Sequence, residues 1–219
     1  MNNLNILYED NHIIVVEKKA NMLCQSDYTK DIDLLTLIKE YIKVKYNKPG
    51  NVYLGLVHRL DRPVGGIMVF AKTSKAASRL SKMIKNHEMI KEYLLICHGK
   101  PNKSGAFEDY IEKNNEISII SDSKKGKFAK LEYLLLDYRN DLSLVKVNLI
   151  TGRHHQIRLQ FASRNYPLYG DQLYGRQDKN QIALFAYHLK FKHPVKDEIM
   201  DFKIYPKGGI WDEFTLYKS

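Results

Sequence analysis

The residues best suited to chemistry begin in the segment 57–66, which has the sequence VHRLDRPVGG. The pattern predicts a strand that delivers titratable side chains to a turn, followed by a buried strand. Two glycines remove Cβ atoms where a ligand or a second backbone must come near. Asp61 is expected at the rim between core and solvent, where a carboxylate can be ionised yet poorly hydrated. An aspartate before Arg-Pro is also common in turns, where it bonds its own backbone, and spacing alone favours that structural role.

A second concentration of polar side chains lies in residues 151–160, TGRHHQIRLQ. Arginines, histidines and glutamines near a strand-to-helix junction offer donors for phosphates and base edges. A zinc site is disfavoured, because adjacent histidines are expected to point apart and no carboxylate or thiolate stands at ligand spacing. A solvated helix face is a credible alternative for Arg153 and Gln160.

The third candidate is Tyr93 in the segment 91–96, KEYLLI. A tyrosine in a strand usually contributes half-buried packing, and Tyr93 alone would be interpreted that way.

Taken together, the three segments resemble one family. His58-Arg59-Leu60-Asp61 with the following glycine pair resembles the His-Arg-Leu-Asp-x-x-Thr-Ser-Gly signature of RluA-type pseudouridine synthases. Lys91-x-Tyr93 resembles the tyrosine motif of that family, and residues 152–158 resemble its Gly-Arg-Thr-His-Gln-Ile-Arg motif. The order and spacing of the three motifs agree, and weaker similarities extend the match from about Ile6 to Tyr205. Two departures are Val64-Gly65 in place of the Thr-Ser pair and His154 in place of a threonine.

The resemblance implies an enzyme that isomerises uridine in structured RNA, either ribosomal or transfer RNA, without a cofactor or a metal. It implies that Asp61 is the nucleophile, that Arg158 is the cation favouring the charged form of Asp61, and that Tyr93 stacks on the target base. It also implies that Arg59 inserts into the RNA as the base flips out of its stack. The other residues expected to bind substrate are His58, Arg62, Arg153, His155 and Gln156.

The composition agrees with an RNA partner. The 35 Lys and Arg exceed the 25 Asp and Glu, so the formal net charge is +10. Each phosphate that a lysine or arginine neutralises releases a condensed counterion, which favours polyanionic partners. A genome that uses lysine freely explains the charge equally well. Four basic residues from 72 to 82 illustrate this, because they bind phosphates or, as the preferred interpretation, form a solvated helix face: Lys72, Lys75, Arg79 and Lys82.

The remaining features favour a soluble, cytoplasmic protein, and we expect a monomer. Cys24 and Cys97 lie far apart outside any CxxC pattern, so we expect reduced, buried thiols rather than a disulfide. No run of 18 apolar residues exists, and no signal-peptide pattern opens the chain. The chain is expected to begin directly with its catalytic domain, without the N-terminal RNA-binding domain of many relatives.

Periodicity predicts more strands than helices, without regular alternation, and therefore an α+β fold. We expect one catalytic domain, residues 1–219, with a mixed, largely antiparallel sheet, flanking helices and a central RNA-binding cleft. Residues 99–127 are polar and are expected to form loops with weak strands. Helices are predicted over residues 31–45, 74–86 and 154–163, and strands over residues 6–8, 13–16, 52–57, 66–71, 93–97, 128–136, 143–150, 183–191 and 200–205.

Two other functional classes compete with the enzyme. One is a non-catalytic RNA-binding or ribosome-assembly protein on the same fold, which the intact set of Asp61, Tyr93 and Arg158 disfavours. The other is a metal-dependent nuclease, disfavoured because the eight histidines are scattered and no carboxylate cluster accompanies them. Insensitivity to EDTA would exclude the nuclease.

Overall fold

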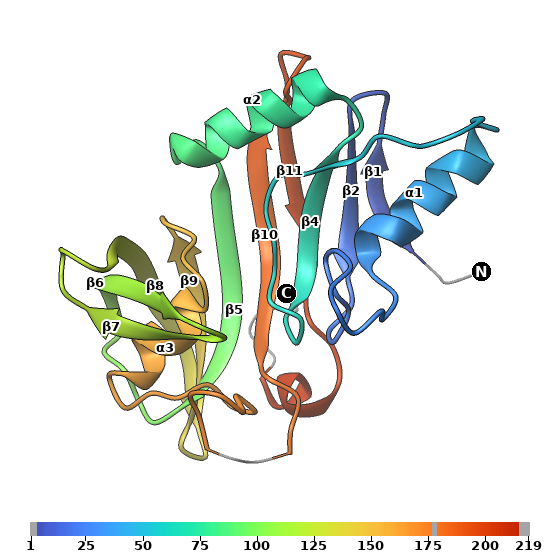
Figure 1. The fold of residues 1–219 in the computed structure, drawn as a ribbon. Coiled ribbons are helices and arrows are strands. Elements are labelled where there is room, and N and C mark those ends of the chain that lie inside the picture. The colour runs from blue at the N-terminus through green and yellow to red at the C-terminus, as the bar shows by residue number, and fades with distance from the viewer. Residues whose placement is uncertain (1–3, 177–178, 215–219) are drawn as a thin grey trace. The chain divides into compact units, whose positions relative to one another are not determined.

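A computed structural model describes residues 4–176 and 179–214 (Figure 1). The contacts between residues divide the chain into two compact units. Unit 1 comprises residues 1–89 and 188–204, and unit 2 comprises residues 90–187 and 205–219.

Unit 1 is built on a sheet with the strand order β1-β2-β4-β10, in which β3 pairs with β4 and β11 with β10. The pairs β1/β2, β2/β4, β3/β4 and β10/β11 are antiparallel. Its apolar core includes both faces of β4, whose seven residues are all buried. The strands are β1 (Asn5–Glu9), β2 (Ile13–Lys18), β3 (Gly55–Leu56), β4 (Gly65–Ala71), β11 (Ile199–Lys203) and the end of β10 (Leu184–Lys192) from His188 onward.

Two helices of unit 1, α1 (Leu34–Lys45) and α2 (Ser74–Lys85), begin at side-chain caps. Asp33 accepts a hydrogen bond from the backbone N–H of Thr36, and Thr73 accepts one from Ala76. These bonds satisfy backbone donors that the first turn of a helix leaves without partners. Helix α1 buries Leu34, Ile38 and Ile42, and α2 buries Ala76 and Leu80, so each has one apolar face.

Unit 2 contains a sheet in the order β5-β9-β8-β6-β7, in which neighbouring strands are antiparallel. A short helix, α3 (Gln156–Ala162), contacts β6 and β7. Its residues Leu159 and Phe161 pack on the apolar face of β6 and β8, and a 3₁₀ helix, η1 (Gly209–Glu213), follows near the C-terminus. The strands are β5 (Ile90–His98), β6 (Ser104–Asn114), β7 (Ile117–Ser121), β8 (Lys127–Arg139) and β9 (Leu142–Leu149).

The predicted α+β class with a largely antiparallel sheet is confirmed. Residues 99–127 were expected to form loops with weak strands, and the structure has more regular secondary structure there: β6 and β7 form a hairpin, with Asn115 (φ 53°) in its turn. The strand expected over residues 52–57 is reduced to β3. Lys72 does not lie on a solvated helix face, because its side chain is only 8% exposed and pairs with Glu9 at 2.7 Å.

Candidate active-site residues

The loop that carries Asp61 is anchored on both sides of this residue. The carbonyl of Asp61 accepts a hydrogen bond from the N–H of Val64 at 3.0 Å, which closes a turn. The Sγ of Cys24 lies 3.1 Å from the carbonyl oxygen of Leu60 and 3.4 Å from its nitrogen. Leu60 is buried and Asp61 is half-buried. The carboxylate therefore stands at the expected rim, on a backbone that neighbouring groups hold in place.

Lys18 holds the other side of this loop. Its fully buried ammonium donates to the carbonyls of Arg62 (3.0 Å), Met22 (2.7 Å) and Lys19 (3.2 Å). Burial lowers the pKa of Lys18 to about 8, although the charge of Asp61 acts in the opposite direction. Sequence reasoning missed this residue, and the one available signal was a lysine at the end of β2, two residues after its apolar run.

The other candidates in this segment lie around the turn. The Nε2 of His58 accepts a hydrogen bond from the backbone N–H of Val69 at 3.1 Å, which requires an unprotonated Nε2. Arg59 is exposed. Arg62 pairs with Asp31 at 2.5 Å, and both side chains are about half exposed, which makes it an accessible contact.

Tyr93 lies in unit 2, on β5 opposite Val147 of β9, and is 8% exposed. Because side chains alternate along a strand, Lys91 shares the face of β5 that carries Tyr93. Burial lowers the pKa of Lys91. Tyr93 thus retains a small accessible surface beside a half-buried cation.

The turn before α3 is organised by Gln156. Its Oε1 accepts hydrogen bonds from the hydroxyl of Thr151 (2.7 Å) and the N–H of Arg153 (3.0 Å). The guanidinium of Arg153 donates to the carbonyl of Phe128 at 2.8 Å, and Gln160 is fully buried. The solvated helix face was therefore wrong for Gln160, whose amide donates to Asp109, while Arg153 is half-exposed but lies in the turn before α3 rather than on the helix.

Arg158 is the most strongly held of the candidates. Its Nε and Nη2 donate to the two carboxylate oxygens of Asp171, at 2.8 and 2.6 Å, and its guanidinium lies 5.3 Å from the ring centre of Tyr174. Burial raises the pKa of Asp171, but the hydrogen bonds and charge of Arg158 outweigh it, so this pKa lies below its usual value. Sequence reasoning missed Asp171 and Tyr174, which follow a tight turn at Gly170, with φ 73°.

His154 and His155 do not point apart, as the sequence led us to expect. Their rings stack with centres 3.7 Å apart, because His155 adopts a left-handed conformation (φ 52°) before α3. The hydroxyl of Ser118 donates to the carbonyl of His154 and lies 3.0 Å from its Nδ1. A hydroxyl has one proton, so Nδ1 of His154 must be the donor in the second bond. The Nδ1 of His155 lies 3.0 Å from the hydroxyl of Tyr174, which connects the stack to Arg158.

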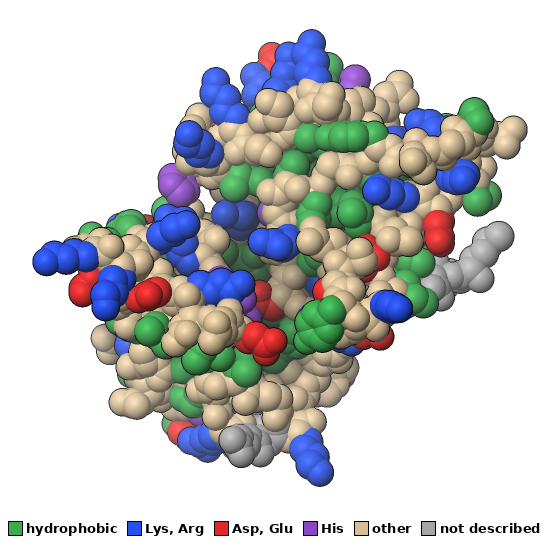
Figure 2. All heavy atoms as spheres, viewed as in Figure 1, with side chains coloured by type: hydrophobic (Ala, Val, Ile, Leu, Met, Phe, Trp, Pro, Cys, Tyr) green, Lys and Arg blue, Asp and Glu red, His purple; other side chains and the backbone are tan. Residues whose placement is uncertain are grey.

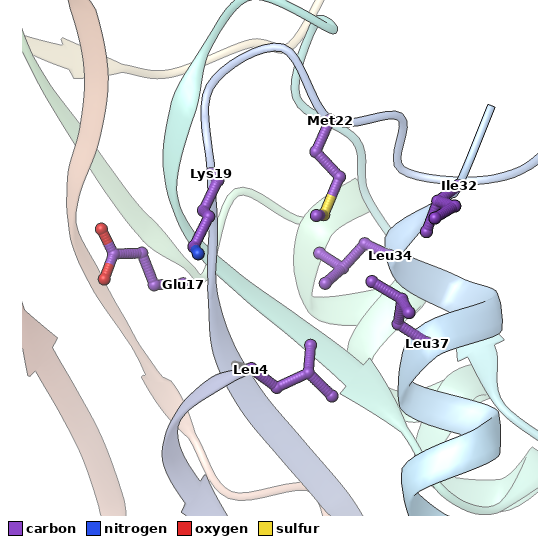
Figure 3. Close-up of a pocket in the computed structure, with 7 residues that line it drawn as sticks. All are labelled: Leu4, Glu17, Lys19, Met22, Ile32, Leu34 and Leu37. Carbon is purple, nitrogen blue, oxygen red and sulfur yellow. The ribbon is translucent and has the colours of Figure 1, made fainter. Parts of the chain in front are cut away.

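A pocket of about 180 Å³ in unit 1 is lined in part by Lys19 and Met22, whose carbonyls accept hydrogen bonds from Lys18. Figure 3 shows Leu4, Met22, Leu34 and Leu37 converging on one space, with Glu17 and Lys19 at its border. It contains none of the predicted site residues. Among the described residues, no group of three or more His, Cys, Asp or Glu side chains is arranged to hold a metal ion.

The candidates thus fall into two sets, one in each unit. His58, Arg59, Asp61 and Arg62 share one loop of unit 1, and the candidates Tyr93, Arg153, His155, Gln156 and Arg158 belong to unit 2.

Comparison with known sequences gives a family. The sequence model of the family described as RNA pseudouridylate synthase matches residues 12–163. Ribosomal large subunit pseudouridine synthase D of Zymomonas mobilis is 31% identical over 216 residues, which cover 91% of this chain and 68% of that protein. An uncharacterized RNA pseudouridine synthase of Mycoplasma genitalium is 35% identical over 239 residues, covering 97% of this chain and 73% of the relative. The chain therefore spans about 70% of the length of these two relatives.

Solved structures agree on the fold. The human protein RNA Pseudouridylate Synthase Domain Containing 4 superposes with a TM-score of 0.78 at 18% identity, covering 92% of this chain and 88% of that one. The human protein RNA Pseudouridylate Synthase Domain Containing 1 superposes with a TM-score of 0.72 at 22% identity, covering 93% of this chain and 84% of that one. Within the described residues, none of the helices combines the length and apolar character that crossing a membrane requires.

Proposed function

The chain belongs to the RluA family of RNA pseudouridine synthases, an isomerase family, and on that premise we propose that Asp61 is the nucleophile and that large-subunit ribosomal RNA is the substrate. The anchored loop around Asp61 carries this proposal. Cys24 and Lys18 fix the backbone before and after the residue, while its carboxylate stays half-buried. A nucleophile held on a fixed backbone meets its substrate with little reorganisation.

The reaction needs no co-substrate. The bond from N1 of the base to C1′ breaks, the uracil rotates, and a bond from C5 to C1′ forms. C5 loses a proton and N1 gains one, so the product is an isomer of uridine. A carboxylate suits covalent catalysis of this kind, because it can form an ester-like adduct and later leave. Asp61 could carry out any of three steps: attack on the base, attack on the sugar, or removal of the proton from C2′. The proposal that Asp61 is the catalytic carboxylate holds for all three.

Tyr93 and Arg158 take part in the same reaction. We assign to Tyr93 the stacking contact with the target base, and its hydroxyl is available for the proton at C5. We assign to Arg158 the stabilisation of negative charge during the reaction. Its bidentate pair with Asp171 supports this role, since the pairing fixes the plane of the guanidinium. The proposal treats residues 1–219 as one catalytic domain.

Contacts with RNA fall to the exposed and half-buried cations. Arg59 inserts where the target base leaves its stack, and it offsets an unstacking cost of a few kcal/mol. His58, Arg62, Arg153, His155 and Gln156 remain predicted substrate contacts. Lys and Arg side chains are spread over the face visible in Figure 2, including the parts where Figure 1 draws α2 and the β6–β7 hairpin. The basic surface of each unit fits a polyanionic partner.

The names of the relatives support ribosomal rather than transfer RNA, because several are called ribosomal large subunit pseudouridine synthase D. We propose a monomer that acts on this RNA in the cytoplasm.

Pseudouridine mapping tests the proposal. Total RNA from cells with and without the gene is labelled with carbodiimide and read by primer extension. A large-subunit site that disappears on deletion and returns with the wild-type protein is the expected result. Asp61→Asn should fail to restore it, whereas the control Asp197→Asn, on an exposed side chain, should restore it. Full restoration by Asp61→Asn would refute the nucleophile assignment.

Two further variants separate the roles. Arg59→Ala should reduce turnover of folded RNA more than that of an unstructured oligomer, and equal losses would remove the flipping role. Arg158→Met should abolish turnover while sparing RNA affinity, whereas a large loss of affinity would make Arg158 a phosphate contact.

A further inference from the structure

Lys91 stands out among the cations of unit 2. Its side chain is half-buried, and no described residue forms an ion pair or a side-chain hydrogen bond with it. The desolvation that lowers its pKa has no described counter-charge to offset it. A half-buried ammonium of this kind is ready for an anion from outside the protein.

The surroundings of Lys91 leave room for that anion. A Cβ atom placed on Gly152 would lie 3.9 Å from the Nζ of Lys91 and would meet no other heavy atom within 4 Å beyond its chain neighbours. Gly152 is exposed, so solvent reaches this side of the ammonium. The absence of a side chain at residue 152 keeps the approach open.

The position of Lys91 relative to Tyr93 indicates which kind of anion Lys91 binds. The two side chains lie on the same face of β5, about 7 Å apart along the strand. Adjacent Glu92 is on the other face, where it accepts a hydrogen bond from Tyr187. A compact ammonium binds phosphate as a point charge, and an RNA strand whose base stacks on Tyr93 carries phosphates within a few ångströms of that base.

We propose that Lys91 binds a backbone phosphate of the RNA strand at the target uridine, beside the open backbone of Gly152. This inference rests on the proposed function. The inference adds to the proposed function a residue that holds the RNA strand in place while the uracil base rotates. Lys91 is then a binding residue, whose loss weakens the complex more than the chemical step.

The test measures binding of an unmodified transcript of large-subunit ribosomal RNA as a function of potassium concentration. All proteins carry Asp61→Asn, so that no turnover changes the RNA. Lys91→Met is compared with Lys91→Arg and with the control Lys43→Met, an exposed lysine of α1 that changes the net charge equally. Folding is checked through the fluorescence of Trp211, the single tryptophan, and Lys91→Gln replaces Lys91→Met if the latter unfolds.

We expect Lys91→Met to weaken binding about tenfold and to lower the slope of log affinity against log salt by about 0.7 to 0.9, the value of one phosphate contact. Lys91→Arg should keep most of the affinity and most of the salt slope, and Lys43→Met should change neither the affinity nor the slope. A slope unchanged by Lys91→Met, or changed equally by Lys43→Met, would overturn the inference. Loss of turnover in the Asp61-containing protein without loss of affinity would overturn it too. A wild-type protein that modifies no uridine would refute the proposed function, while the salt slope would still decide the role of Lys91.

Discussion

Replacing Asp171 by alanine would remove the carboxylate to which the buried guanidinium of Arg158 donates two hydrogen bonds. The side chains of this pair are 0% and 4% exposed, respectively. Removing one partner of such a pair costs about 3–5 kcal/mol, because the remaining charge cannot return to water. Asp171 also accepts hydrogen bonds from the N–H groups of Leu173 and Tyr174 at 2.9 and 3.2 Å, and both would be lost. We therefore expect the upper part of that range.

The same pair predicts a dependence on pH. The pKa of Asp171 is depressed in the folded protein, so its contribution to stability is fully present above the unfolded value of about 3.9. The contribution is lost as the pH falls through the folded pKa. The difference in unfolding free energy between wild type and Asp171→Ala should therefore be constant from pH 7 down to about pH 5 and should shrink below about pH 4.

Urea unfolding followed by Trp211 fluorescence measures this difference, since Trp211 belongs to the core of unit 2. Glu108→Gln is the control, because Glu108 pairs with Lys130 on the surface and its loss should change stability little. A cost of less than about 1 kcal/mol for Asp171→Ala, or a cost that does not change down to pH 3, would refute the reasoning that this pair is a buried, charge-compensated contact.

Three other predictions follow from buried titratable groups. Burial opposes the ionisation of Glu9, but hydrogen bonds, of which that from Lys45 is the strongest, lower its pKa to about 2. Glu9→Gln should therefore lower the unfolding free energy by about 2 kcal/mol at pH 7, and this loss should fall toward zero near pH 2. Thermal unfolding measures it. The pKa of Lys18 is lowered to about 8, so the folded state releases its proton first. The unfolding free energy of wild type relative to Lys18→Met should rise by about 3 kcal/mol between pH 8 and 10.5, and a flat difference in urea titrations would contradict this. Burial raises the pKa of Cys24, and that of Cys97 to about 12, so both should resist a disulfide reagent in the native protein and react on unfolding; fast native labelling of either would refute their burial.

The sequence predicted the elements whose apolar pattern is local. The buried run of β4 and the periodic faces of α1 and α2 were located within three residues of their ends. The β6–β7 hairpin was predicted only as weak strands within loops, because many of its residues are polar and Ile117, Ile119 and Ile120 stay about 40% exposed. An edge hairpin that buries few side chains gives a weak alternation, and the many Asn, Ser and Lys residues then suggest loops.

The sequence likewise predicted only part of the candidate site. The motifs point to the candidate residues but not to the residues that hold them in place. Asp61, Tyr93 and Arg158 are proposed as catalytic residues from the resemblance to a family. Their supports were not predicted, because each lies far along the chain from the group it holds. Lys18 binds the carbonyl of a residue 44 positions away, and Asp171 binds Arg158 across 13 positions.

Periodicity also assigns charged side chains to the surface, where most of them belong. Lys18 and Asp171 are exceptions because three carbonyls satisfy the ammonium, while a guanidinium and two backbone N–H groups satisfy the carboxylate. Burial of a charge is tolerated when every donor or acceptor finds such partners. Lys18 and Asp171 both contact residues of the proposed catalytic segments. A fixed backbone or a fixed guanidinium plane increases the reaction rate most at such positions. Lys18 and Asp171, two buried charges with several partners each, thus lie next to proposed catalytic residues, whereas the half-buried Lys91, which has no ion pair among the described residues, is our proposed contact for the substrate.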